Sequence, residues 1–223
     1  RYAPNEQFYQ APDARLPLLN KYPTFNLWYT LGLKEVMGGQ YSYHSIQFRA
    51  KKAFYLSPIG WSVAFAEAGR IFGQVPYPLL TVHRANQSYS YQTESYNLMN
   101  FLEFASDHYA AVNITHYFGG FFLNRVPLLK RLKLREVITF KGIWGGLDER
   151  SRPSAANGLL QFPTDDQGRT ITYTLERAPY MEASVGILNI FHFLRIDYVR
   201  RFNYLDHPGV SPNGVRARIQ VEF

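Results

Sequence analysis

The side chains that could carry chemistry are few in this 223-residue chain, and they lie far apart. The absence of cysteine excludes thiolate metal sites and disulfide bonds. His108 and His116 fall on one face of an expected strand, but roughly 27 Å separates them at about 3.4 Å per residue, so they cannot bind one ion. The other histidines show no ligand spacing either: His44, His83, His192 and His207. We therefore expect no metal and no cofactor.

Signals for hydrolysis and for calcium binding are equally weak. The chain contains neither Gly-x-Ser-x-Gly nor His-Glu-x-x-His. A serine and a histidine from separate strands could still meet on the outside of a sheet, and the sequence leaves that alternative open. The stretch "TDDQG" could hold calcium through Asp165 and Asp166, although a solvated hairpin turn is the commoner use of such residues. We expect no catalytic residues.

Charged residues instead recur at alternate positions within long, otherwise apolar segments. Because successive side chains of a strand point to opposite faces, each segment would carry its charges on one face and its apolar side chains on the other. The charged face is predicted to line a watery lumen, where it could pass or hold anions. Pairing with acids on a plug or on a missing half of the wall is the simpler explanation. The charges are Arg49, Lys51, Glu103, Arg135, Lys141, Glu182, Arg195, Asp197, Arg201, Arg216, Arg218 and Glu222.

Long strands must position these charges. Alternation predicts strands over 24–33, 41–54, 95–104, 108–118, 134–144, 180–187, 195–204 and 213–223, with 59–72 ambiguous, for about nine strands. Glu136 and Arg200 are exceptions on apolar faces. Most strands run roughly 10 to 13 residues, against a soluble mode of about 5 to 6, and about 9 to 11 residues cross a bilayer. The pattern predicts an all-β fold, a transmembrane antiparallel β-barrel. A soluble β-sandwich or lipocalin-like barrel is the alternative.

Composition agrees with a membrane barrel but does not require one. No uninterrupted apolar run approaches the roughly 18 to 20 residues of a membrane-spanning helix. Aromatic residues reach 17%, which suits aromatic girdles at two membrane interfaces and would also suit a Tyr-rich sandwich. The net charge of +7 is scattered, and the basic stretch "LLKRLKLRE" lacks a nucleic-acid motif, so we expect no nucleic-acid partner. That stretch could contact lipid headgroups or periplasmic proteins, or be a plain interfacial turn with snorkelling side chains.

The connections also favour an outer-membrane barrel, in which periplasmic turns are short and outer loops longer. Counting back from the C-terminus makes 189–193 a tight periplasmic turn and 206–213 the last extracellular loop. The longest connection, 146–178, becomes extracellular, with a small hairpin that turns at "DDQG". The same count puts the long segment 74–93 in the periplasm, which fits poorly.

Several long stretches resemble one family. "GQVPYPLL", "YNLMNFLEFASDHY", "GGFFLNRVPLLKRLKLRE" and "PYMEASVGILNIFHFLRIDYVRRFNYLD" look like the C-terminal part of Bacteroidota outer-membrane proteins. Those proteins join an N-terminal carboxypeptidase-regulatory-like domain to a C-terminal domain of unknown function. The barrel part is in turn similar to the BamA-like assembly and secretion superfamily, whose barrels have sixteen strands. The resemblance implies that residues 1–223 are about nine C-terminal strands of such a barrel.

The resemblance also gives meaning to the last strand. Its alternation toward a final aromatic looks like the signal by which barrel proteins are recognised for insertion, carried here by Val215, Ala217, Ile219, Val221 and Phe223. One departure matters, because BamA-like proteins carry a Val-Arg-Gly-Phe/Tyr motif in a long lumen loop before the twelfth strand. That tetrapeptide is absent, and the matching connection is expected to be a tight turn at 106–108. An insertase or secretion-pore mechanism is thereby in doubt.

The expected function is that of a non-enzymatic outer-membrane component of an assembly or envelope-biogenesis complex, with its C-terminus in the periplasm. A transport or secretion pore is the runner-up, and a membrane-embedded hydrolase the third class. The expected partners are outer-membrane lipid, other outer-membrane or periplasmic proteins, and upstream strands of the same protein or another chain. Such strands are needed because an open sheet edge cannot face lipid.

Overall fold

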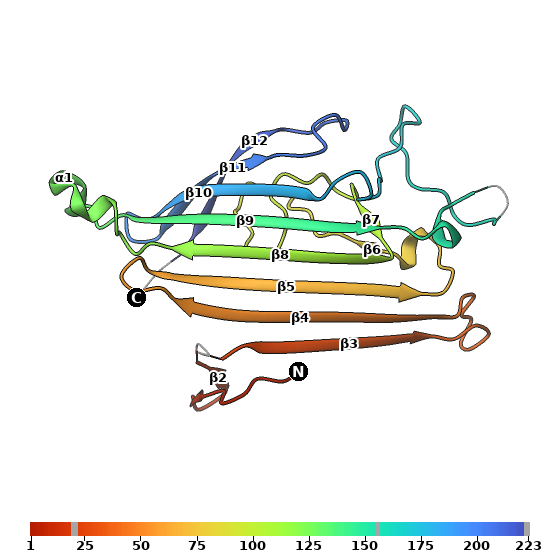
Figure 1. Ribbon diagram of the computed structural model, residues 1–223, viewed down its shortest axis with the longest axis horizontal. Coiled ribbons are helices and arrows are strands. Elements are labelled where there is room, and N and C mark those ends of the chain that lie inside the picture. The colour runs from red at the N-terminus through yellow and green to blue at the C-terminus, as the bar shows by residue number, and fades with distance from the viewer. Residues whose placement is uncertain (19–21, 155–156, 221–223) are drawn as a thin grey trace.

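In a computed structural model that describes residues 1–18, 22–154 and 157–220, the chain is all-β and centres on one antiparallel sheet. Eight long strands are hydrogen-bonded in the order β12-β11-β10-β9-β8-β5-β4-β3 (Figure 1). All neighbours in this order run antiparallel. The strands are β3 (Thr24–Gly32), β4 (Tyr43–Tyr55), β5 (Trp61–Phe72), β8 (His108–Tyr117), β9 (Arg135–Gly146), β10 (Tyr180–Ile190), β11 (Leu194–Arg201) and β12 (Asn213–Ile219).

Smaller elements lie at the ends and on one face of this sheet. Two short ribbons pair β1 with β2 and β6 with β7. The described residues contain no helix that is both long and apolar enough to cross a membrane. The small elements are β1 (Phe8–Gln10), β2 (Arg15–Pro17), η1 (Tyr77–Leu79), β6 (Thr81–Val82), β7 (Ala105–Ser106), η2 (Leu123–Arg125), α1 (Pro127–Lys130) and η3 (Glu149–Ser151).

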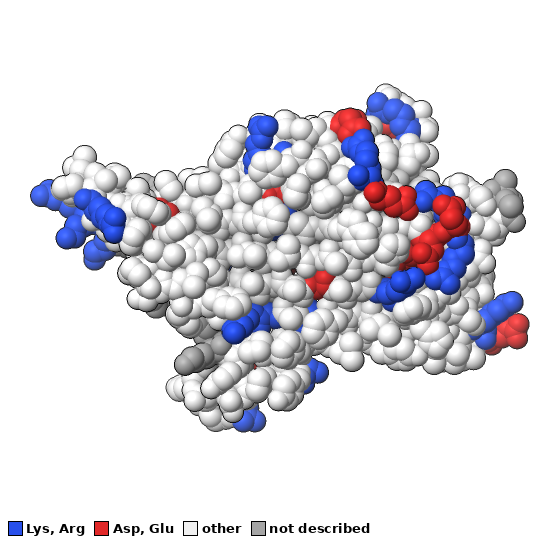
Figure 2. Space-filling model, in the orientation of Figure 1, with Lys and Arg blue, Asp and Glu red and all other residues white. Residues whose placement is uncertain are grey.

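In the main sheet the charged side chains are buried on one face and the apolar side chains are exposed on the other. This is the reverse of a soluble sheet, so we call the sheet inverted. Along β11, Arg195, Asp197 and Arg201 are fully buried, whereas Ile196 and Tyr198 are 38% and 51% exposed. We call the face that carries the buried charges the covered face, and the other the open face. Exposed apolar side chains continue along the open face of the neighbouring strands: Leu27, Phe48, Val112, Ile114, Ile138, Phe140, Val185, Ile187 and Val215. Figure 2 shows the charged residues gathered mainly at the two ends of the molecule.

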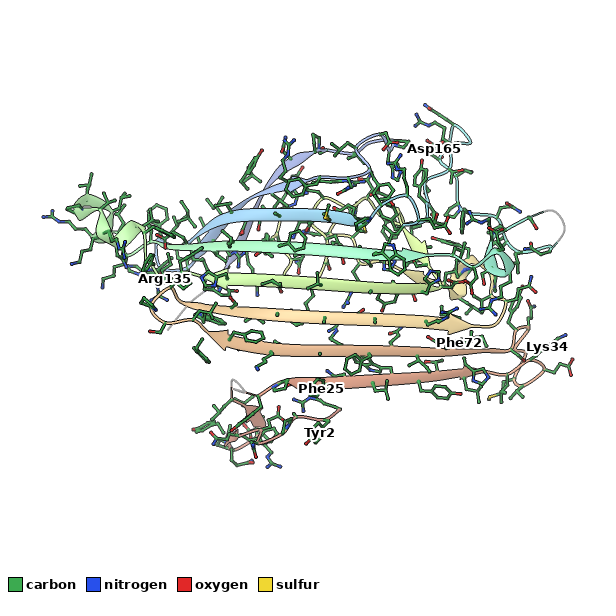
Figure 3. All side chains as sticks on the ribbon, viewed as in Figure 1. Tyr2, Phe25, Lys34, Phe72, Arg135 and Asp165 are labelled. Carbon is green, nitrogen blue, oxygen red and sulfur yellow. The ribbon has the colours of Figure 1, made fainter. Side chains whose placement is uncertain are left out.

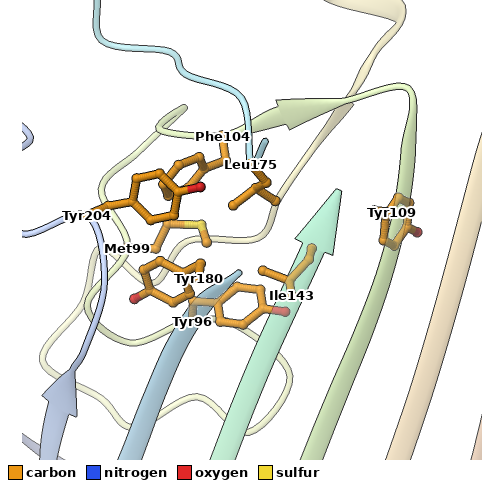
Figure 4. Close-up of a cluster of buried hydrophobic side chains, with 8 residues drawn as sticks. All are labelled: Tyr96, Met99, Phe104, Tyr109, Ile143, Leu175, Tyr180 and Tyr204. Atoms are coloured by element: carbon orange, nitrogen blue, oxygen red, sulfur yellow. The ribbon is translucent and has the colours of Figure 1, made fainter. Parts of the chain in front are cut away.

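The connection between β5 and β8, residues 73–107, packs against the covered face, and we call it the covering segment. It runs behind β8, β9 and β10 in Figure 1. The largest buried cluster joins this segment to the sheet and to two loops (Figure 4). Its members are Tyr96, Met99 and Phe104 of the covering segment, Tyr109, Ile143 and Tyr180 of the strands, and Leu175 and Tyr204 of the loops. The core therefore lies between the covering segment and the sheet.

The covering segment corrects three predictions. Residues 95–104 are not a strand, because Leu102 adopts a left-handed φ of 59° and the N–H groups of Asn97 and Leu98 donate to the Glu182 carboxylate rather than to a sheet ladder. The ambiguous stretch 59–72 supplies β5, and the loss of 95–104 leaves eight strands in the main sheet where about nine were counted. The predicted tight turn at 106–108 is also wrong, since the connection before β8 is the whole covering segment.

Eight strands place the long connections together. The covering segment leaves the same end of the sheet as residues 33–42, 147–179 and 202–212, which removes the poor fit of 74–93 (Figure 1). The opposite end carries the short turns 56–60 and 191–193 and the connection 118–134. The small hairpin expected within 146–178 is reduced to a single bridge between Thr164 and Thr170 around a turn at Asp165.

The sheet stays open, because its edge strands β3 and β12 are not paired with each other in the described part of the chain. Tyr2 exchanges backbone hydrogen bonds with Phe25 at the β3 edge, and their rings stack (Figure 3). At the β12 edge, the Tyr91 N–H donates to the Ala217 carbonyl at 2.8 Å, and the Ala217 N–H donates to the Tyr89 carbonyl at 3.1 Å. The covering segment thus caps part of the β12 edge.

Candidate functional site

The charged residues of the covered face are brought together by strand register. Lys141 on β9 lies directly opposite Glu182 on β10, and Glu182 lies opposite Arg201 on β11. Side chains directly opposite each other in an antiparallel sheet are close enough to interact. Alternation along each strand and register between strands therefore build a row of buried charges across β9, β10 and β11.

Arg201 and Glu103 form a fully buried ion pair. The Arg201 Nη2 donates to Glu103 Oε1 at 2.6 Å and Nη1 donates to Oε2 at 2.9 Å, and both side chains are essentially inaccessible. Arg201 also donates to the carbonyls of Leu98 and Tyr204, and His207 Nδ1 donates to Glu103 at 2.7 Å. A buried pair is tolerated only when further hydrogen bonds satisfy both charges, as these do. The pair fastens the covering segment to β11.

Glu182 and Lys141 hold the backbone of the covering segment. The Glu182 carboxylate accepts the N–H groups of Asn97 at 2.8 Å and Leu98 at 3.1 Å, together with the Tyr180 hydroxyl. Lys141 Nζ donates to the carbonyls of Gln92 and Ser95 at 2.7 and 2.6 Å. Buried backbone groups need partners, and an irregular segment has no ladder to supply them. These two charges supply those partners.

A second buried pair lies beside the first, on β11. Arg195 donates to Asp197 through Nε at 2.6 Å and through Nη2 at 2.8 Å. Its guanidinium sits 4.3 Å from the centre of the Tyr91 ring, a cation–π contact with the covering segment. From β12, Arg216 donates to the Asn97 carbonyl at 2.9 Å. Arg195 and Arg216 contact the covering segment directly, and Asp197 is linked to it through Arg195.

Toward β3 and β4 the covered face is more open. Arg49 donates to Glu67 at 2.8 Å and to Glu94 at 3.1 Å, and Arg84 donates to Glu67 at 2.8 Å. A cavity of about 70 Å³ lies beside these groups, and one of about 400 Å³ opens next to it, with Trp28 in its lining. This arrangement can bind a polar ligand or water, because the two guanidinium groups, the Glu67 carboxylate and the Trp28 indole line the larger cavity.

The remaining residues of the predicted charged set are less buried or lie elsewhere. Lys51 on β4 is exposed, with its ammonium 4.9 Å from the Phe65 ring centre, and Arg135 and Arg218 are half-buried. Glu103 belongs to the covering segment and not to a strand. Of the proposed insertion signal, Val215, Ala217 and Ile219 lie exposed on the open face of β12. Glu222, Val221 and Phe223 lie outside the described residues.

Glu136 and Arg200, the two exceptions that the alternation pattern showed on apolar faces, have local partners at the ends of strands. Glu136 accepts the N–H groups of Phe122 and Leu123, so it fastens the connection 118–134 to the start of β9. Arg200 donates to the Asn213 side chain at 2.9 Å. Both charges lie where a strand meets a turn, which explains their departure from the apolar pattern.

The structure also creates a Ser–His pair that sequence motifs miss. Ser62 on β5 lies opposite His116 on β8, and Ser62 Oγ is 2.7 Å from His116 Nδ1. His116 Nε2 is 2.9 Å from the Ile59 carbonyl, which can only accept, so Nε2 carries the proton and Nδ1 accepts from Ser62. Only the pairing of β5 with β8 brings these residues together.

A second unforeseen cluster joins Asp107, His108 and Asp148, whose ligand atoms lie within 4.8 Å of one another. The Asp107 carboxylate is already occupied, because it accepts from His108 Nδ1 at 2.6 Å and from the Asp148 N–H at 2.9 Å. Arg150 lies 2.6 Å from the Asp148 carboxylate and Arg70 lies 3.7 Å from it. These contacts already compensate the negative charge of the two carboxylates, which a bound cation would otherwise do.

Comparison with known proteins gives one match. Residues 1–146 match a family model described as the C-terminal domain of a family of unknown function, DUF5686. No curated protein and no solved structure matches the chain. The matched residues run from the N-terminal ribbon to the end of β9 and contain the whole covering segment.

Proposed function

Because the chain belongs to the DUF5686 family, whose C-terminal domain it matches over residues 1–146, we propose that it forms part of the wall of a non-enzymatic outer-membrane β-barrel. The protein would serve as a component of an outer-membrane assembly or envelope-biogenesis complex. The observation that carries this proposal is the inverted sheet. Exposed apolar surface on this scale is unfavourable in water and favourable against lipid, whereas the buried charges suit a polar interior.

The two open edges support a wall that continues beyond this chain. Unpaired backbone groups cannot face hydrocarbon, so the parts of the β3 and β12 edges that Tyr2 and the covering segment leave unpaired need partner strands. Upstream strands of the same protein, or another chain, would close a barrel of an even number of strands, sixteen by the BamA-like resemblance. The short turns and the C-terminal strand end share one side of the sheet, which supports a periplasmic C-terminus. The Bacteroidota origin and the N-terminal carboxypeptidase-regulatory-like domain belong to the same proposal.

The covering segment would then plug the interior of the barrel. It occupies the connection in which, by the resemblance, BamA-like proteins carry a loop in the lumen. The Val-Arg-Gly-Phe/Tyr tetrapeptide of that loop is absent from the sequence, which weighs against an insertase mechanism. A plug fastened by the Arg201–Glu103 pair favours a structural or scaffolding role over free passage through the wall.

A transport or secretion pore is the second candidate. The observation that favours it is the cavity of about 400 Å³ lined by Trp28, Arg49 and Arg84, which the covering segment leaves unfilled. Ion conductance of the purified whole protein in a planar bilayer would support the pore. Co-purification of a stable partner through detergent, without conductance, would support the assembly component.

A membrane-embedded hydrolase is the third candidate, favoured only by the Ser62–His116 hydrogen bond. The Ser62 side chain is buried, and the histidine is oriented by a carbonyl rather than by a carboxylate. We therefore expect no labelling of the native protein by a fluorophosphonate probe. Labelling that disappears in Ser62→Ala would replace the non-enzymatic proposal with this one.

The absence of cysteine from residues 1–223 allows a direct test of the inverted sheet, once any cysteine elsewhere in the full-length protein is replaced by serine. Leu27 and Thr30 are both exposed on β3 but point to opposite faces. In the full-length protein in membranes, Thr30→Cys should react with a charged maleimide and Leu27→Cys should react only with a lipid-soluble one. Equal reaction of both cysteines with the charged reagent would show that water covers both faces and would overturn the proposal.

A further inference from the structure

The connection 118–134 at the short-turn end of the sheet has an unusual surface, and we call it the basic tip. It contains Arg125, Lys130, Arg131 and Lys133 and no acidic residue. In Figure 2 these side chains form a blue group at the extremity that Figure 1 labels α1. Within the described part of the chain, the structure pairs none of these four cations with an acid. The tip therefore carries four positive charges that form no ion pair with a described residue.

Apolar side chains are exposed on the same tip. Leu128 is 74% exposed, and Phe122, Val126 and Leu132 are about half exposed. The nearby turn between β10 and β11 exposes Phe191 and Phe193 in the same way. Cations interspersed with exposed leucine and phenylalanine suit the boundary between lipid headgroups and acyl chains, where apolar groups enter and cations remain at the phosphates.

The tip is held in place on the sheet. Glu136 accepts two of its N–H groups, those of Phe122 and Leu123, and the Asn189 side chain donates to the Lys133 carbonyl at 2.8 Å. Arg125 also covers the Phe121 ring at 4.1 Å. These contacts keep the cationic surface next to the open face, so a membrane around the open face would meet the tip at its surface.

The opposite end of the molecule provides the contrast. Three of its arginines are paired with acids: Arg152 with Glu176 at 2.8 Å, Arg177 with Asp206 at 2.7 Å and Arg169 with Asp165 at 2.7 Å. That end is close to neutral locally, whereas the tip carries charge of one sign. The asymmetry points to a partner of opposite charge at the tip end alone.

We propose that the basic tip binds the anionic headgroups of phospholipids in the leaflet at the short-turn end of the sheet. This inference rests on the proposed membrane location. Phosphate diesters at a bilayer surface offer the negative charge, and the acyl boundary beneath them takes the exposed leucine side chains. Each cation near an anionic surface contributes to the attraction, and the attraction weakens with salt.

The test uses the full-length protein in nanodiscs of phosphatidylcholine alone and of phosphatidylcholine mixed with phosphatidylglycerol. Native mass spectrometry then measures the ratio of the two lipids retained by the protein. We expect phosphatidylglycerol to be enriched, and the triple variant Lys130→Gln, Arg131→Gln, Lys133→Gln to lower that enrichment about tenfold. The matched control, Arg152→Gln, Arg169→Gln, Arg177→Gln, neutralises the opposite end and should leave the enrichment unchanged.

The outcomes separate this inference from the proposed function. Failure to insert into either nanodisc would reject the membrane location itself. Insertion with equal lipid ratios in the native protein and the tip variant would overturn only the inference about the tip. A periplasmic protein that crosslinks to the tip, with no preference for phosphatidylglycerol, would likewise overturn it. Leu128→Asn supplies a second measurement, since it should weaken retention of both lipids without changing their ratio, and a ratio lowered as far as in the triple variant would overturn the inference that the cations select the headgroup.

Discussion

The two faces of the main sheet differ in which side chains are buried. On β11, Arg195, Asp197 and Arg201 are buried to completion, while Ile196 and Tyr198 between them are exposed. The covered face is buried by this chain itself, because residues 73–107 return to it and supply carboxylates and carbonyls. The open face receives no such cover within the described residues. The difference shows that polarity alone does not decide burial; the position of partner groups does.

The largest test of this comparison removes one charge of the buried pair. Arg201→Met leaves the Glu103 carboxylate buried beside His207 without its guanidinium, which should cost about 3–5 kcal/mol of stability. Denaturation of the detergent-solubilised protein measures the loss. Arg200→Met is the control, since Arg200 makes only an exposed hydrogen bond with Asn213 and should be nearly neutral. Equal stability of the two variants would mean that the covering segment does not depend on this pair.

A charge on the open face should be the next most harmful change. Val185 is 63% exposed near the middle of β10, so Val185→Arg would be harmless if water covered this face. Against lipid, an arginine near the bilayer midplane should cost about 2–4 kcal/mol. Equilibrium folding into vesicles measures the cost, with Val185→Leu as the control. Unchanged folding of the arginine variant would remove the main distinction between the faces.

Acid should loosen the covering segment through His83. Burial is the largest influence on this histidine and lowers its pKa to about 3, and its Nε2 lies 3.0 Å from Ser106 Oγ. Because the unfolded histidine binds a proton below its usual pKa of about 6.5 while the folded one stays neutral, stability falls as the pH drops from about 6.5 toward 3. Protease cleavage within residues 73–107 should rise over that range. His83→Asn should flatten the response, and an unchanged pH profile in that variant would assign the response to another group.

The smallest effect is expected at the exposed ion pair between two loops. Arg177 holds the pKa of the Asp206 carboxyl below its usual range, through hydrogen bonds of 2.7 Å to both carboxylate oxygens. A depressed carboxyl pKa stabilises the fold above the unfolded pKa, and that contribution disappears as the carboxyl is protonated in acid. Solvent screens this exposed pair, so Asp206→Asn should barely change the melting temperature at neutral pH. A large loss would show that exposed charges matter as much as buried ones.

Strand patterning was predictable because it is local. Alternation correctly assigned an all-β antiparallel fold and most strand positions, and it separated the two faces of each strand before any contact was known. It failed at 95–104, where Leu98, Met99 and Phe104 are buried in an irregular segment whose spacing imitates a strand. It also left 59–72 undecided, since the alanines of β5 carry little hydrophobic contrast with their neighbours.

The amino-acid sequence by itself determined which side chains lie on which face of each strand, because an extended backbone sends successive residues to opposite sides. Only the tertiary structure decided which face is covered and what satisfies its charges. Glu103 meets Arg201 and Ser62 meets His116 across long stretches of chain. These contacts depend on strand order, on register and on the packing of the covering segment against the sheet. All three arise from the packing of the whole chain and correspond to no local pattern in the sequence.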